Sequence, residues 1–172
     1  MSENSILDGL AYSPAEGSLK FKEVPYLMIR PETIASLQTE IESQMGRLNA
    51  GAAFYNAGFT GGKLSGARYR EEFKLTAHEA VEFMCKMGRE IGWGGFRLVE
   101  LDSSSKRMVV EVDHSPFAKA YGKSEYEGVC HLIRGVLGGL AHGIFLQEVE
   151  SVESMCIALG NPLCRFEIDQ AK

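Results

Sequence analysis

Two cysteines that flank a turn near the C-terminus are the residues best suited to chemistry. Cys156 and Cys164 are equally distant in sequence from Gly160, which opens the turn sequence Gly-Asn-Pro. If the segment folds as a hairpin centred on Gly160, these two cysteines lie opposite each other, with Cβ atoms roughly 4.5–5.5 Å apart. Two thiolates at that spacing can bind one zinc ion, each at about 2.3 Å. A zinc site is therefore one interpretation of the hairpin.

Glu153 and Cys130 could complete such a site. Glu153 precedes Cys156 by three residues, and in a straight strand the two side chains would point to opposite faces. Joint ligation therefore requires a bend, a bulge or a helical turn between them. Cys130, near the start of a glycine-bearing helix, could supply the fourth ligand. Four protein ligands would make a closed Cys3Glu site of structural rather than catalytic type.

The same cysteines have other interpretations. Free cysteines are often buried as small apolar side chains, and Cys156 and Cys164 could instead form a disulfide across the hairpin. Cys85 falls in the apolar pattern of a separate helix, which predicts a core residue. A reducing cytosol favours thiols or metal ligands over disulfides.

Apolar periodicity predicts the elements that position these residues. We expect a strand over 25–30, helices over 31–48, 50–59, 76–91 and 126–144, a central hairpin of 96–101 and 107–113, and a terminal hairpin of 147–158 and 163–168. The second helix should end near Gly61-Gly62, and Thr76 with Glu79 forms a capping box. This order indicates an α+β domain over residues 21–172, with its core motif at 109–168, an antiparallel sheet enclosing a small-molecule pocket, and a flexible arm at 1–20.

The charge balance argues against nucleic-acid and membrane partners. The 172 residues contain 18 Lys and Arg against 23 Asp and Glu, for a net charge of −5. Such a chain offers no basic surface to phosphate backbones or anionic lipid. The longest apolar run is far shorter than the ~20 residues of a membrane span, and the first residues lack the pattern of a signal peptide. A cytoplasmic location is expected.

The segment from Cys130 to Phe166 resembles the 4-vinyl reductase domain family. The family pattern is a cysteine before a helix of small residues, then E-x-x-C, a glycine turn and C-x-F. This chain has Glu153-Ser-Met-Cys156, Gly160 and Cys164-Arg-Phe166. In the phenol-responsive transcription activators of this family, three cysteines and one glutamate hold a structural zinc. The resemblance places that set on Cys130, Glu153, Cys156 and Cys164, and it implies an α+β domain around an apolar chamber, often in a homodimer.

A small apolar or aromatic molecule is the ligand that this resemblance implies. A pocket for it would combine apolar walls with a few orienting polar groups. The candidates are Phe54, Tyr55, Phe59, Phe96, Val109, Glu111, Phe117, Tyr121 and Arg134. Val109 stands where the phenol sensors have a tryptophan, and the single tryptophan here is Trp93. The resemblance therefore does not extend to phenol itself.

Three functions remain open at this point. The one we expect is a zinc-containing, sensor-like ligand-binding domain that signals through a partner protein, because no helix-turn-helix or ATPase segment is evident. A tetrapyrrole 4-vinyl reductase, or an accessory protein of (bacterio)chlorophyll metabolism, is the alternative that the family name suggests, although no nicotinamide or flavin fingerprint is present. The third is a protein–protein assembly module, like a Golgi tethering subunit of the same broad fold.

Overall fold

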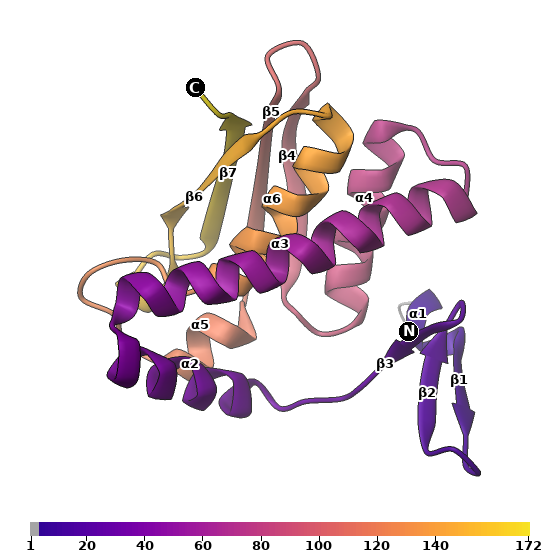
Figure 1. Cartoon of the computed structure of the whole chain (residues 1–172), viewed down its shortest axis with the longest axis horizontal. Helices are drawn as coiled ribbons and strands as arrows, with labels where there is room; N and C mark the ends of the chain where they lie inside the picture. The colour runs from indigo at the N-terminus through magenta and orange to yellow at the C-terminus, as the bar shows by residue number, and fades with distance from the viewer. Residues whose placement is uncertain (1–3) are drawn as a thin grey trace.

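The computed structural model describes residues 4–172, in which helices and two antiparallel sheets form the α+β fold expected from the sequence (Figure 1). The elements are α1 (Ser5–Asp8), β1 (Leu10–Ser13), β2 (Ser18–Phe21), β3 (Val24–Tyr26), α2 (Pro31–Met45), α3 (Arg47–Glu72), α4 (Ala77–Glu90), β4 (Gly95–Asp102), β5 (Arg107–Asp113), α5 (Pro116–Tyr121), α6 (His131–Phe145), β6 (Val149–Met155), η1 (Ile157–Leu159) and β7 (Cys164–Gln170). The small sheet has the order β1-β2-β3, and the large sheet has the order β4-β5-β7-β6.

Helices α4 and α6 cover one face of the large sheet, and α3 crosses outside them as a further layer (Figure 1). The alternation along β5 determines which face is covered. Met108, Val110 and Val112 are fully buried in the core that the sheet shares with these helices. Glu111, on the opposite face, pairs with Arg165 of β7 at 2.6 Å. Because successive strand residues point to opposite faces, the apolar positions can face only one layer of helices.

Helix α3 is much longer than the predicted helix over residues 50–59. It runs from Arg47 to Glu72 and continues through Gly61 and Gly62, which the sequence predicts to end it. Glycine weakens a helix in isolation. Here Gly62 lies against α6, where an added Cβ would come within 2.8 Å of the Val136 Cα. Tertiary packing with α6 therefore outweighs the low helix propensity. No helix within residues 4–172 is both long and apolar enough to span a membrane.

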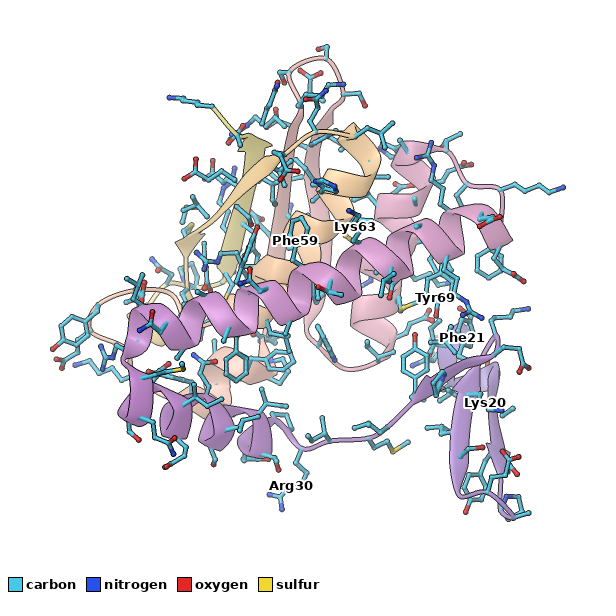
Figure 2. The ribbon with its side chains drawn as sticks, in the orientation of Figure 1. Lys20, Phe21, Arg30, Phe59, Lys63 and Tyr69 are labelled. Atoms are coloured by element: carbon cyan, nitrogen blue, oxygen red, sulfur yellow. The ribbon has the colours of Figure 1, made fainter. Side chains whose placement is uncertain are left out.

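Residues 4–26, here termed the N-terminal module, pack against the ends of α3 and α4. The sequence predicts a flexible arm over residues 1–20; residues 1–3 lie outside the described residues, and the rest of that range contains α1, β1 and most of β2. Phe21 points toward Tyr69 of α3, with ring centroids 6.3 Å apart (Figure 2). The domain division at residue 21 stays a prediction, although β2 crosses it.

The carboxylate of Glu90, at the end of α4, also holds the N-terminal module in place. It accepts hydrogen bonds from the Ile6 N–H at 2.9 Å and the Ser5 hydroxyl at 3.0 Å. We expect Glu90→Ala to cost about 1–3 kcal/mol of docking free energy, because the Ile6 N–H loses its charged acceptor. Limited proteolysis should then cleave the module several-fold faster. Glu72→Ala, at an exposed helix end, is the control, and equal cleavage of both variants would exclude this role for Glu90.

Candidate metal centre and ligand groove

The C-terminal hairpin contains the bulge that joint ligation by Glu153 and Cys156 requires. Strand β6 pairs with β7 up to Glu153, which lies opposite Phe166. The register then shifts, so that Met155 lies opposite Arg165. One extra residue in β6 breaks the alternation of side chains along this strand. Glu153 and Cys156 can therefore both reach a single site, although three residues separate them.

Cys130 reaches the same site from the start of α6, where it is the N-cap residue. Its backbone N–H donates to Oε2 of Glu153 at 2.9 Å, so the helix start and the bulged strand are joined directly. Gly128 leaves room for this carboxylate, because a Cβ there would come within 2.9 Å of the Glu153 Cγ and overlap the carboxyl group. A larger residue at position 128 would displace Glu153.

The four donor groups converge with the spacing of a tetrahedral site. The Sγ atoms of Cys130 and Cys164 are 3.8 Å apart, and those of Cys164 and Cys156 are 3.9 Å apart. All four ligand atoms, including the Glu153 carboxylate oxygen, lie within 4.8 Å of one another. Four ligands around zinc at about 2.3 Å would have sulfurs about 3.8 Å apart. A disulfide requires about 2.05 Å, and the cysteines here are free thiols.

The charge and bonding of Glu153 also suit a cation. Its Oε1 is buried and has no hydrogen-bond partner within residues 4–172. Burial, with the nearby charge of Cys156, raises the pKa of Glu153 to about 8. A buried acceptor without a partner is energetically costly. A divalent cation between the four groups would satisfy this oxygen and stabilise the carboxylate.

The three thiols are arranged to share a limited negative charge. Hydrogen bonds from Cys130 and then Cys164 lower the pKa of Cys156, whereas the bond to Cys156 raises the pKa of Cys130. The protein alone therefore favours one thiolate, and three thiolates would need a cation between them. Cys85 is absent from this cluster and is buried in the main core, as the sequence predicts.

The predicted ligand-binding residues do not surround one cavity. Phe54, Phe96 and Val109 are buried at 8%, 5% and 0% exposure. Glu111 lies on the outer face of the sheet, where it pairs with arginines of β4 and β7. Tyr121 of α5 donates a hydrogen bond to Glu42 of α2 at 2.7 Å.

Tyr55, Phe59 and Arg134 lie together at the contact between α3 and α6. The Arg134 guanidinium is 5.0 Å from the centroid of the Tyr55 ring, and the Phe59 ring meets that of His142 with centroids 5.4 Å apart. Figure 2 shows Phe59 one turn from Lys63 on α3. These three side chains mainly join two helices.

Phe117, the remaining candidate, lines an apolar groove of about 550 Å³ between the N-terminal module, residues 27–31 and the main body. The groove is lined by Ile6, Leu7, Leu10, Leu19, Pro25, Tyr26, Leu27, Met28, Ile29, Pro31, Ile34, Ile91, Gly92, Trp93, Pro116, Phe117 and Leu132. The rings of Trp93 and Phe117 meet edge to face, with centroids 5.1 Å apart. The size and apolar lining are typical of small-molecule sites.

Sequence reasoning missed most of this groove. The run Leu27-Met28-Ile29 is part of a predicted strand, but in the structure it follows β3 as extended chain, with Met28 83% exposed. Three consecutive large apolar residues outside regular structure indicate a ligand or partner surface. This run before Pro31 was the available signal.

Residues 108–170 match the model of the vinyl-4-reductase (V-4-R) domain family, which confirms the resemblance seen between Cys130 and Phe166. Among curated proteins, none matches the chain in sequence. Three solved structures show the same fold. The phenol-responsive sensory domain of the transcription activator PoxR, crystallised with phenol, is 15% identical with a TM-score of 0.84, covering 96% of this chain and 87% of that chain.

The two other structures are more distant. A vinyl-4-reductase family protein from Methanocaldococcus jannaschii is 17% identical with a TM-score of 0.58, over 86% of this chain and 85% of that chain. A trafficking protein particle complex subunit 3 from Naegleria fowleri, covalently bound to palmitic acid, is 13% identical with a TM-score of 0.55, over 83% and 95%. At these identities the similarity establishes the fold, and function has to be argued from the site.

Proposed function

We propose that this chain, whose residues 108–170 match the vinyl-4-reductase domain family, is a ligand-binding domain that holds one structural zinc ion and binds a small apolar or aromatic molecule. The observation that carries the proposal is the apolar groove of about 550 Å³. It is supported by the similarity of nearly the whole chain to a sensory domain that was crystallised with phenol.

Zinc has a structural role in this proposal. Cys130, Glu153, Cys156 and Cys164 would supply all four ligands of a tetrahedral ion, which leaves no open position for a substrate. The ion would join the start of α6 to the bulge of β6 and to the start of β7. These elements form part of the core beneath the helices, so metal loss would loosen the scaffold rather than remove a reactive group.

The lining of the groove favours aromatic ligands. Trp93 and Phe117 already pack edge to face, and an aromatic ligand could extend this arrangement, since such pairs contribute about 0.5–1.5 kcal/mol beyond area burial. The indole N–H of Trp93 makes no hydrogen bond within residues 4–172, so it is available to a ligand hydroxyl. Signal output would pass to a partner protein, and a homodimer in the cytoplasm is the assembly and location that we propose.

The single tryptophan provides a direct test of ligand binding. Titration with 1-naphthol should change the fluorescence of Trp93, because the ring lines the groove. Ile29→Asp places a charge in the apolar lining and should weaken binding at least tenfold. Leu146→Asp introduces the same charge at a residue that is 80% exposed and outside the groove, and its affinity should match that of the unaltered chain. Equal affinities of the two variants would exclude the groove as the ligand site.

A further inference from the structure

A second hollow, of about 220 Å³, lies where α3 and α6 both begin. The two helices run in the same direction, because Gly51 contacts His131, Gly58 contacts Gly135 and Gly66 contacts Leu140. Their N-terminal ends therefore lie together. Neither helix has a side-chain hydrogen bond at its N-cap. Each N-terminus carries about half a positive charge, so the hollow is electropositive before any side chain is considered.

His131 is the buried polar side chain of this hollow. It is only 5% exposed, and its ring lies over Gly51, where an added Cβ would be 3.0 Å from the Cε1 atom. No side-chain hydrogen bond of the ring occurs within residues 4–172, although the ring lines the hollow. Buried imidazole nitrogens are normally paired. An unpaired buried ring at an open hollow indicates a missing hydrogen-bonding partner.

Two arginines border the same hollow without pairing to a carboxylate. The Arg47 guanidinium lies 4.2 Å from the Tyr126 ring centroid, and that of Arg134 lies 5.0 Å from the Tyr55 centroid. Neither forms an ion pair within residues 4–172. The Nε of Arg134 is buried and has no hydrogen-bond partner. Aromatic contacts hold both groups in place while leaving their N–H groups free for an anion.

The nearby carboxylates do not neutralise this arrangement. Glu42 already accepts hydrogen bonds from Tyr121 at 2.7 Å and from the Gln38 amide at 2.9 Å. Glu150 lines a separate hollow on the β6 side of Arg134 and is not paired with it. Glu127 is exposed, lines the hollow and competes with any added anion. Two guanidinium groups and two helix ends leave the hollow positive in spite of this one competitor.

We propose that this hollow binds a small carboxylate anion, held by Arg47, Arg134 and an N–H of His131. The Tyr55 ring and the side chains of Leu48 and Ala52 supply apolar surface for the rest of the molecule. The volume accommodates a molecule about the size of benzoate. The site is separate from the groove around Trp93, because the two share no lining residue.

Benzoate is the probe, and benzyl alcohol is its uncharged control with the same ring. We expect benzoate to shift the imidazole signals of His131 in ¹H–¹³C spectra of the full chain, and benzyl alcohol to leave them unchanged. Arg47→Gln should weaken benzoate binding at least tenfold, whereas Glu127→Gln should tighten it severalfold because the competing carboxylate is lost. Arg70→Gln removes the same charge from the other end of α3 and should have no effect.

Three results would overturn the proposal. The first is His131 signals that benzoate does not move. The second is equal affinity for benzyl alcohol, which would make the hollow an apolar site. The third is equal weakening by Arg47→Gln and Arg70→Gln, which would reduce binding to general surface charge. Ile29→Asp should leave benzoate binding unchanged, so failure here is distinguishable from failure of the proposed groove.

Discussion

Cys156→Ser is expected to abolish zinc binding and to lower the free energy of unfolding by more than about 4 kcal/mol. The bound ion would fix the N-cap of α6, the bulged end of β6 and the start of β7, and metal binding contributes directly to folding free energy. The unaltered chain, purified without chelator, should contain one zinc per chain by elemental analysis. A strong chelator should lower its melting temperature by about 10 °C, from ~2–4 °C per kcal/mol for a chain of this size.

Cys85→Ser is the matched control for this experiment. It makes the same chemical change at a buried cysteine in the main core that lies outside the cluster. The variant should lose about 1–3 kcal/mol of stability and still bind one zinc. Glu153→Gln keeps the size of the side chain but removes its charge, so zinc affinity should fall. An unaltered chain without zinc, or a Cys156→Ser variant that retains it, would refute the metal proposal.

The positions of the metal ligands could be predicted because each depends on a strong local signal. Gly160 with the following Asn-Pro specifies the turn, and the turn places Cys156 near Cys164. The sequence also shows what the ligand set requires, namely an irregularity between Glu153 and Cys156. The structure supplies it as a bulge before Met155. The type of irregularity could not be predicted, because a bulge depends on pairing with β7 as well as on the residues of β6.

The ligand-binding residues could not be predicted in the same way. Tyr55, Phe59 and Arg134 have the residue types of a pocket lining, but they are placed at a helix–helix contact. Which apolar residue lines a cavity is decided by packing between layers, and residues 27–31 come to lie beside Trp93 only in the folded chain. The length of α3 has a similar cause. Local helix propensity predicts an end at Gly61-Gly62, and the contact with α6 overrides it.

Gly62→Ala is expected to be among the most destabilising single substitutions in this chain. An added Cβ would lie 2.7 Å from the Val136 carbonyl carbon and overlap the carbonyl oxygen. Backbone atoms cannot rotate away as a flexible side chain can, so α3 and α6 would have to separate. Loss of this contact should cost about 3 kcal/mol or more, measured by urea unfolding monitored through circular dichroism.

Gly61→Ala is the control on the neighbouring residue. Nothing lies within 4 Å of a Cβ at Gly61, so alanine should stabilise the helix by about 0.5–1 kcal/mol through its higher propensity. The two variants should therefore change stability in opposite directions, although the chemical change is identical. Separation of the helices would also move Cys130, the N-cap of α6, so Gly62→Ala should weaken zinc binding while Gly61→Ala does not. Two equally stable variants would contradict the close packing of α3 against α6, and with it the mechanical link from α3 to the metal centre.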